Sequence, residues 1–325
     1  YKMGNYSGSL ELFRSVLPAI KEMGDVKSLA TSLNEIGLIE IKRENFSAAL
    51  KYLEKALRLR VDSGDIEGEG ISVNSIGFIY FNKCDYTKAR KYFTRSLKIR
   101  EEIGNLIGQA YSLHNLGSID DVFGDYNQAK SRKKRSYVIF KQIGNPSGES
   151  HTLNSLGVLE MDWGNYASAE RYFRKSLALA RKLGIKDLQR RTLLNISELY
   201  LLMFDPVKAK VELEQVELLT KEVNSKMAAL AYAMLSIRLE VFAQGLNSKI
   251  SKEFNEVISE FDSLGKPLLT GAAHYNLAWA AFNSQAGSSQ RGDLYRISLQ
   301  KAEKIFKRIK AKKWLDKLAA IRLVD

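Results

Sequence analysis

The chain has 325 residues, of which 45% are hydrophobic and 27% are charged, so it has enough apolar side chains for a packed core and wholesale disorder is excluded. Its only cysteine, Cys84, excludes an internal disulfide framework and indicates a reducing compartment, which we take to be the cytoplasm. The formal net charge is +13, and no run of uncharged apolar residues is long enough to predict a membrane-spanning helix.

The sequence repeats itself with a step of 40 residues, because small residues of three kinds each recur at this spacing. The clearest columns are Gly24, Gly64, Gly104, Gly144 and Gly184; Ala49, Ala89, Ala129, Ala169 and Ala209; and Ser32, Ser72, Ser112, Thr152 and Thr192. Matched columns at one fixed period indicate an array of similar structural units.

The chain begins inside one of these units. The tripeptide at residues 4–6 corresponds to the one at residues 124–126, three periods later, so residues 1–23 are predicted to form only the second helix of a repeat. Tyr1 is not a methionine and no signal-peptide pattern follows it, so we expect the missing first helix to lie upstream in a longer protein.

Residues 24–223 contain five clear units, each predicted to form two helices. In the first unit Leu33 and Ile36 mark the apolar stripe of the first helix, and Ala49 and Leu53 mark that of the second. A capping residue is predicted before each second helix, and these residues are Asn45, Asp85, Asp125, Asn165 and Asp205.

Residues 224–309 are predicted to form two degenerate units, the second of which is interrupted by a polar loop at residues 284–290. Residues 310–325 are predicted to form a capping helix, because an array needs to cover its last apolar face. The sequence therefore predicts sixteen helices, made up of one unpaired helix, seven pairs and one cap.

The columns resemble the tetratricopeptide repeat (TPR). The small residue of the first TPR helix matches Gly37, Gly77, Gly117 and Gly157, and the alanine of the second helix matches the column from Ala49 to Ala209. The 40-residue step resembles the long-helix subclass that includes the LGN/Pins adaptors and many bacterial sensor and regulator arrays. The resemblance implies an all-α fold, a right-handed α-α superhelix formed here as a single solenoid over residues 1–325, with the first helix of each pair on the concave face.

The outer columns of the first helices predict a partner-binding groove, because they combine amides, aromatic rings and a few charges. The candidate residues are Asn34, Ile71, Asn74, Phe78, Tyr111, His114, His151, Asn154 and Arg191. The asparagines have two interpretations, since they could bind a ligand or bridge adjacent repeats. The two histidines lack a third ligand, so we expect no metal site.

Two stretches hold most of the net positive charge, because residues 126–143 and 301–325 each carry +6. The candidate residues of these basic patches are Arg132, Lys133, Lys134, Arg135, Lys307, Arg308, Lys312 and Lys313. Such patches could bind nucleic acid, an acidic protein or a membrane surface, and ordinary solvated helix faces would give the same pattern.

Repeat three breaks the pattern of its neighbours. Lys133 stands where other units have leucine or phenylalanine, and Asp120 and Asp121 stand where the second repeat has Tyr80 and Phe81. We expect Asp120 to pair with Lys133, because an unpaired buried charge would cost several kcal/mol. The pair would be either a polar exchange within the core or a softened hinge or docking patch.

No phosphate-binding glycine loop, zinc-binding helix motif or cysteine pair occurs, so we expect neither an enzyme nor a cofactor. We instead expect a protein- or peptide-binding scaffold that forms the sensory or regulatory region of a larger signalling protein. Nucleic-acid association through the basic patches and self-association into a homo-oligomeric array are the alternatives.

Overall fold

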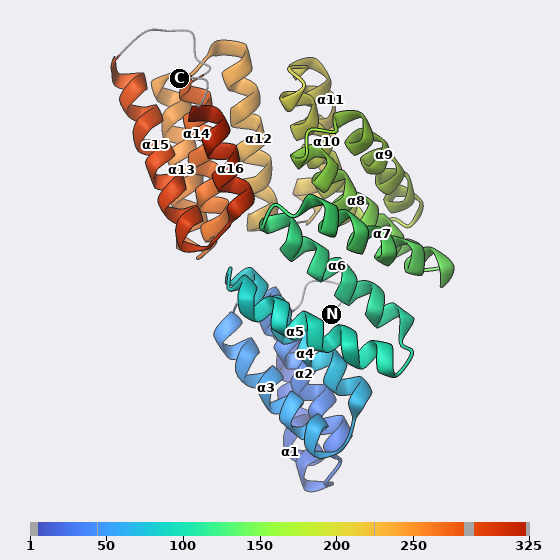
Figure 1. Ribbon diagram of the computed structural model, residues 1–325. Coiled ribbons are helices and arrows are strands. Elements are labelled where there is room, and N and C mark those ends of the chain that lie inside the picture. The colour runs from blue at the N-terminus through green and yellow to red at the C-terminus, as the bar shows by residue number, and fades with distance from the viewer. Residues whose placement is uncertain (1–5, 44, 224, 283–288, 323–325) are drawn as a thin grey trace. The chain divides into compact units, whose positions relative to one another are not determined.

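The computed structural model describes residues 6–43, 45–223, 225–282 and 289–322, and these residues form sixteen α-helices and no strand (Figure 1). The predicted all-α class and helix number are confirmed within them. Most of the predicted polar loop, residues 284–288, lies outside the described residues. The helices are α1 (Tyr6–Glu22), α2 (Val26–Lys42), α3 (Phe46–Asp62), α4 (Ile66–Asn82), α5 (Tyr86–Glu102), α6 (Leu106–Val122), α7 (Tyr126–Gln142), α8 (Pro146–Asp162), α9 (Tyr166–Lys182), α10 (Lys186–Leu202), α11 (Pro206–Val223), α12 (Lys226–Gln244), α13 (Ser248–Ser263), α14 (Pro267–Phe282), α15 (Ser289–Arg308) and α16 (Lys312–Arg322).

The helix starts follow the predicted capping pattern. The Asp85 carboxylate accepts a hydrogen bond from the backbone N–H of Lys88 at 3.1 Å and so satisfies a donor that the helix leaves unpaired. Asn165 is the exception, because its side chain donates instead to the Glu160 carboxylate at 2.9 Å. The same capping bond is made by Asp25, Asn45, Asp65, Asn105, Asp125, Asn145 and Asp205.

The turn within a helix pair requires a residue in the left-handed backbone region. Gly124 and Gly164 take this position with φ of 76° and 85°, while Cys84 and Phe204 take it in their own repeats with φ of 58° and 57°. A side chain is strained in this region, whereas glycine is not. Cys84 therefore occupies a glycine position of the repeat.

Close helix crossing explains the glycine column of the first helices. A Cβ atom on Gly157 would lie 2.5 Å from the Cδ1 atom of Phe173, and one on Gly77 would lie 2.7 Å from the ring of Phe93. Both phenylalanines are completely buried. Because Gly77 of α4 and Gly157 of α8 have no side chain, the aromatic ring of the following helix lies directly against the backbone at these positions.

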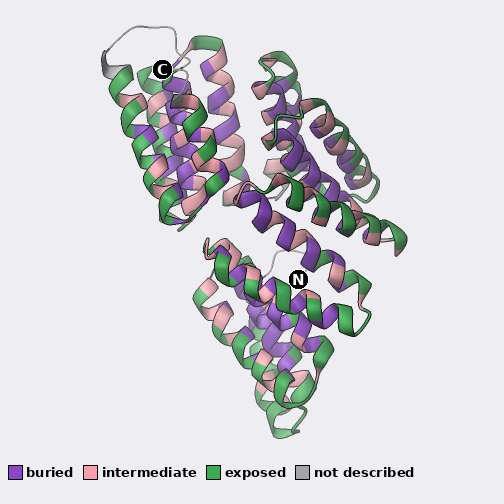
Figure 2. Ribbon diagram, viewed as in Figure 1, coloured by how far each residue is buried: buried purple, intermediate pink, exposed green. Residues whose placement is uncertain are grey.

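The chain divides into two compact units, Tyr1–Ile119 and Asp120–Asp325, with the boundary inside α6. In each unit the buried residues follow one stripe of each helix, and the exposed residues follow the opposite stripe (Figure 2). The arrangement of all residues as one continuous solenoid stays a prediction.

Each unit has its own apolar core. In the first unit, Leu53, Ile76 and Ile79 pack together between α3 and α4. In the second, one cluster centres on residues such as Phe173 and Leu199, and another includes residues of α12, α13 and α14.

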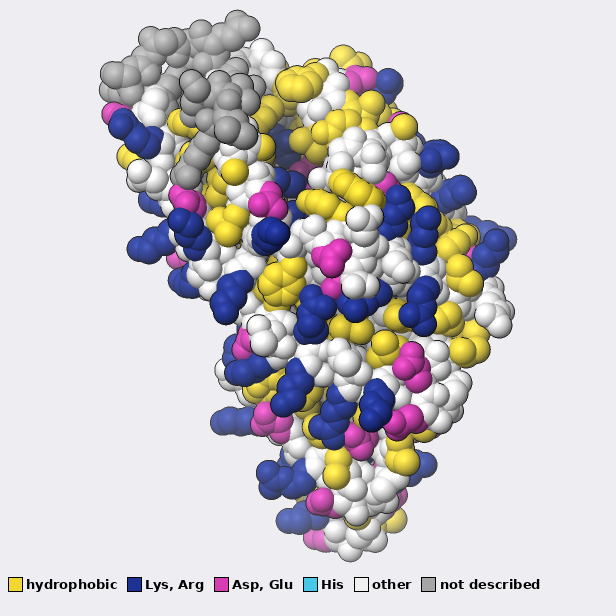
Figure 3. Space-filling model, in the orientation of Figure 1, with side chains coloured by type: hydrophobic (Ala, Val, Ile, Leu, Met, Phe, Trp, Pro, Cys, Tyr) yellow, Lys and Arg dark blue, Asp and Glu magenta, His cyan; other side chains and the backbone are white. Residues whose placement is uncertain are grey.

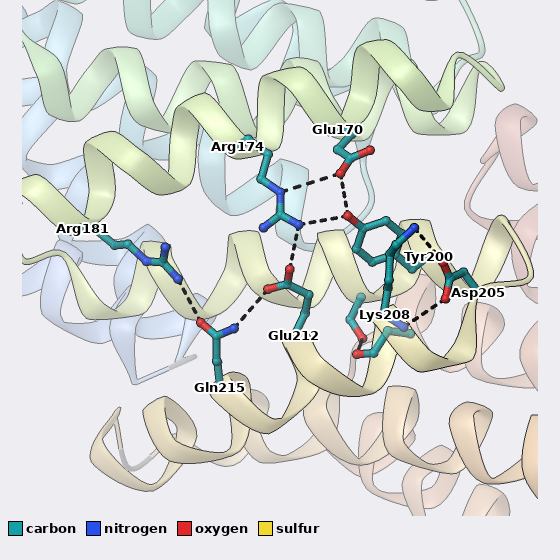
Figure 4. Close-up of polar contacts among 10 residues, drawn as sticks. Glu170, Arg174, Arg181, Tyr200, Asp205, Lys208, Glu212 and Gln215 are labelled. Carbon is teal, nitrogen blue, oxygen red and sulfur yellow. Dashed lines mark hydrogen bonds and ion pairs between the residues drawn. The ribbon is translucent and has the colours of Figure 1, made fainter.

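Polar contacts tie α9, α10 and α11 together on the side of the second unit drawn in Figure 4. The Arg174 guanidinium donates to the Tyr200 hydroxyl at 2.9 Å and to the Glu212 carboxylate at 2.7 Å, and the same hydroxyl donates to Glu170 at 2.5 Å (Figure 4). Farther along, Arg181 donates to Gln215. These arginines therefore connect α9 of one repeat to α10 and α11 of the next.

One described helix, α12, is long and apolar enough to cross a membrane by length and composition, with a mean hydropathy of 1.2 over the best window. The helix carries Arg238, which is buried. Its Met234, Ile237 and Val241 belong to an apolar cluster with α13 and α14. On this side, α12 therefore packs against the helices that follow it.

Candidate ligand-binding pocket

A pocket of about 370 Å³ opens in the second unit, where the first helices of successive pairs lie side by side. Helices α8, α10, α12 and α14 contact one another in this order, and α16 follows α14. Apart from Phe261 of α13, every residue that lines the pocket belongs to one of these five helices.

The pocket walls are mainly apolar, with a few polar groups that converge on them. The apolar lining comes mostly from α10, α12 and α14 and includes Leu194, Met227, Ala231, Met234, Leu235, Leu269 and Ala272. Among the polar residues, Glu198 and Arg238 neutralise each other in an ion pair of 3.2 Å. Arg191 is exposed and has no acidic partner among the described residues, so it leaves a positive charge at the pocket.

A buried ionic cluster forms the end of the pocket beside α16. The Lys313 ammonium lies 2.7 Å from Asp162 and 3.3 Å from Asp121, and the Lys317 ammonium lies 2.6 Å from the other oxygen of Asp162. Burial alone would raise the pKa of Asp162, but the two ammonium groups outweigh it and lower that pKa. Burial opposes the charge on Lys313 too, and the two carboxylates nevertheless raise its pKa.

Repeat three supplies the other side of this cluster, and its pairing differs from the sequence prediction. Asp120 pairs with Arg132 at 2.5 Å, whereas Lys133 lies 3.8 Å from Asp121. The expected Asp120–Lys133 pair is therefore wrong by one residue. The two neighbouring acids point to different partners because successive positions on a helix face different directions. Burial lowers the pKa of Lys133, and Asp121 opposes that effect.

The two basic patches lose part of their predicted membership. Lys133 and Lys313 are buried, so their inclusion in an exposed patch is wrong. Arg132 is half-buried and paired, and Lys307 pairs with Glu303 at 2.7 Å. The residues that stay exposed without an acidic partner in the described structure are Lys134, Arg135, Arg308 and Lys312. Lys and Arg side chains also cover much of the surface over α7 and α9 (Figure 3).

The predicted groove residues of the first unit fall into two groups. Ile71, Phe78 and Tyr111 are exposed and could meet a partner, and His114 is half-buried. The asparagines are engaged within the array. The Asn74 amide oxygen accepts from Asn115 at 3.1 Å.

Asn34 is also engaged, because it is buried and its amide oxygen accepts from both Arg60 and Ser72 at 3.4 Å. The second unit repeats the bridge, since Asn195 donates to the amide oxygen of buried Asn154 at 3.0 Å. Of the two interpretations of the asparagine column, the structure supports bridging between adjacent repeats.

The remaining predicted groove residues of the second unit are His151 and Arg191, both exposed. Only Arg191 lines the pocket. His114 and His151 belong to different compact units, and the described residues contain no group of three or more His, Cys, Asp or Glu side chains that could hold a metal ion.

Sequence reasoning missed the half of the pocket that comes from the degenerate repeats and the cap. Asn276, Trp314 and Lys317 line it, but their helices lack the repeat columns that identify the concave side. The available signal was a pair of anomalies in the sequence, namely Asp121 at a position that is apolar in the other four clear repeats and a lysine-rich last helix.

The comparisons with known proteins agree with the repeat pattern. Family models described as tetratricopeptide repeat match residues 29–62, 70–142 and 150–183. The chain contains tetratricopeptide repeats. A comparison with curated proteins found no match.

Three solved TPR-like structures resemble this TPR chain over most of its length. A Rap protein complexed with Competence and Sporulation Factor matches with a TM-score of 0.69 and 16% identity, covering 96% of this chain and 86% of that one. Aspartyl phosphate phosphatase F from Bacillus subtilis matches with a TM-score of 0.65 and 14% identity, covering 91% and 73%. The apo form of the quorum sensor NprR from B. thuringiensis matches with 0.62 and 14%, covering 90% and 82%. At these identities the likeness establishes the fold.

Proposed function

We propose that this TPR protein is a non-catalytic scaffold that binds a short peptide, or an extended segment of a partner protein, in the pocket of its second unit. The observation that carries the proposal is the pocket itself, which is lined by the helices that TPR proteins use for their concave face. Its volume lies within the range of about 300–1,000 Å³ that is usual for ligand sites.

The chemistry of the lining favours a peptide with at least one apolar side chain. Methionine, leucine and alanine walls would bury that side chain, and flexible methionines adapt to different shapes. Asn195 and Asn276 offer amide groups near the backbone of such a ligand, and Arg191 offers a cation for a carboxylate. The Rap complex and the quorum sensor NprR, which share the fold, support this kind of role.

We further propose that the chain serves as the sensory or regulatory interaction region of a larger cytoplasmic signalling protein. Binding of the ligand would then change the activity of another part of that signalling protein. Nucleic-acid association and self-association stay predictions from the sequence, and no contact in the described structure adds to them.

The proposal can be tested by selecting peptides from a phage-displayed library of random heptapeptides on the whole chain. The comparison variant is Ala272→Trp, which places an indole in the pocket. The matched control is Ala178→Trp, at an exposed position of α9 outside the pocket. We expect wild type and A178W to enrich the same peptides and A272W to lose them. Failure to enrich any peptide, or equal enrichment on A272W, would contradict the proposal.

A further inference from the structure

The last helix, α16, is part of the pocket although its strongest polar contacts are to helices far away in the sequence. Trp314 and Lys317 line the pocket, and Lys313 and Lys317 bind acids of α6 and α8. These ion pairs span 192, 151 and 155 residues of sequence. A terminal helix that only covered the preceding pair would need none of them.

We propose that α16 is a closing element of the pocket, so that docking of α16 and binding of a ligand stabilise each other. This inference rests on the function proposed above and adds how that site is regulated. The ionic cluster holds α16 against repeats three and four, and the ligand packs against the face that α16 presents.

The cluster is an alternating chain of charges that is complete only when α16 is docked. Lys133, Asp121, Lys313, Asp162 and Lys317 follow one another with opposite signs at distances between 2.6 and 3.8 Å. Without α16, Asp162 loses both ammonium partners and Asp121 keeps only the more distant Lys133. Buried charges that lose their partners destabilise a structure strongly. In the undocked state, water must take the place of the lysines around Asp162 and Asp121. This end of the pocket is therefore open to water when α16 is undocked.

The apolar hold on α16 is small by comparison. The helix has only 11 residues, and isolated helices of that length are marginal in water. Leu318 is buried, and the Trp314 ring stacks on Phe306 with centroids 5.1 Å apart and meets the Tyr275 ring edge-on. Docking of α16 therefore depends on a few contacts, so one additional contact can raise the fraction of molecules in which α16 is docked.

A pocket ligand supplies that contact. A side chain that touches Trp314 gains binding free energy only while α16 is docked, so the ligand prefers the docked state. By thermodynamic linkage, a docked α16 raises ligand affinity by the same factor by which the ligand favours docking. Any variant that lowers the fraction of molecules with α16 docked must lower the affinity for the ligand in proportion.

The test uses two neighbouring aspartates of α6, neither of which lines the pocket. Asp121→Asn removes one of the two carboxylates that hold Lys313, whereas Asp120→Asn removes a buried carboxylate that holds Arg132 of α7. D120N is thus a matched control for lost charge in repeat three. The readouts are backbone hydrogen exchange in residues 312–322 and the Kd of a peptide obtained by the selection above.

We expect D121N to speed exchange in residues 312–322 at least tenfold and to weaken the peptide several-fold, while D120N leaves both near wild type. A second part of the test uses the wild type alone and so does not depend on whether a variant folds. Saturation of the wild type with the peptide should slow hydrogen exchange in residues 312–322. An unchanged exchange rate on peptide saturation would overturn the proposal, as would D121N and D120N behaving alike. Failure of the proposed function is distinguishable, because no peptide would then bind the wild type at all.

Discussion

Lys313 and Asp162 form an ion pair of 2.7 Å although 151 residues separate them in the sequence. Lys313 also reaches Asp121, which stands in repeat three where the other repeats have an apolar residue, namely Ile41, Phe81, Met161 and Leu201. The irregular repeat and the lysine-rich last helix are therefore two halves of one contact. The contact places α16 at the pocket.

Lys133 is the member of the ionic cluster whose removal should stabilise the protein. It is fully buried, its pKa is lowered by burial, and nearby Lys313 repels it. We predict that Lys133→Leu raises the free energy of unfolding by about 1–2 kcal/mol, since Asp121 keeps Lys313. Chemical denaturation should be compared with Asp121→Asn, which we expect to lower stability by about 3 kcal/mol because it leaves buried Lys133 without its acidic partner and leaves Lys313 with Asp162 alone. A loss of stability in K133L would show that the lysine has a structural role.

Gly157 should not tolerate even a methyl group. A Cβ atom there would lie 2.5 Å from buried Phe173, so Gly157→Ala forces the ring or the helix to move. We predict a loss of about 1–3 kcal/mol in the free energy of unfolding. The control is Gly292→Ala in α15, where no atom lies within 4 Å and alanine should stabilise the helix by about 0.5–1 kcal/mol. Equal effects of the two substitutions in denaturant titrations would refute the packing account.

His274 of α14 should make the second unit sensitive to mild acid. Burial, followed by the nearby Lys301, lowers the pKa of this histidine to about 4, while Asp262 acts weakly in the opposite sense. As the pH falls, His274 becomes protonated near pH 6.5 in the unfolded chain but only near pH 4 in the folded chain. The stabilising contribution is therefore complete above pH 6.5 and is lost as the pH falls through this window, by about 3 kcal/mol in all.

The measurement for His274 is the difference in unfolding free energy between wild type and His274→Gln from pH 7 to pH 4. We expect that difference to change across the window, with the wild type losing more stability than the variant. Ala178→Gln is the control, because Ala178 is exposed and its replacement changes no titratable group. Parallel pH profiles for wild type and H274Q would rule the prediction out.

Arg191 should set a preference for ligands with a carboxylate. It is the pocket cation that no acidic side chain neutralises in the described structure, whereas Arg238 is paired with Glu198. For a selected peptide that contains an acidic group, we predict that Arg191→Ala weakens binding by about tenfold, which corresponds to about 1.4 kcal/mol for one charged hydrogen bond. The same peptide with its acid replaced by the amide should bind wild type and R191A alike in isothermal titration calorimetry. Tenfold weakening of that amide peptide as well would assign Arg191 another role.

The sequence predicted most of the fold because the information was periodic. The column from Gly37 to Gly157 repeats the same packing problem in four repeats, so its four copies confirm one another. Caps such as Asp85 act locally and can be read without knowing the tertiary structure. The pocket of the second unit is lined mainly by first helices of the predicted pairs, although Arg191 is the only predicted groove residue in its lining.

The rest of the site could not be predicted, since it depends on contacts that no period encodes. Whether Asp120 or Asp121 meets Lys133 depends on helix rotation by one position, and the spacing of columns does not fix it. The lysines of α16 read as a solvated face because their partners, including Asp162, lie more than a hundred residues away. The pocket walls from α12 and α14 were hidden by the loss of the repeat pattern there.

The central claim, that the pocket of the second unit binds a peptide, is tested most directly by NMR of methionine methyl groups. Met161, Met227 and Met234 line the pocket, whereas Met23 and Met203 are exposed and lie outside it, so the chain contains its own controls. Titration with a peptide from the selection should shift the signals of the three pocket methionines in a saturable manner and leave the other two unchanged. Shifts confined to Met23 or Met203, or no shifts at all, would contradict the account.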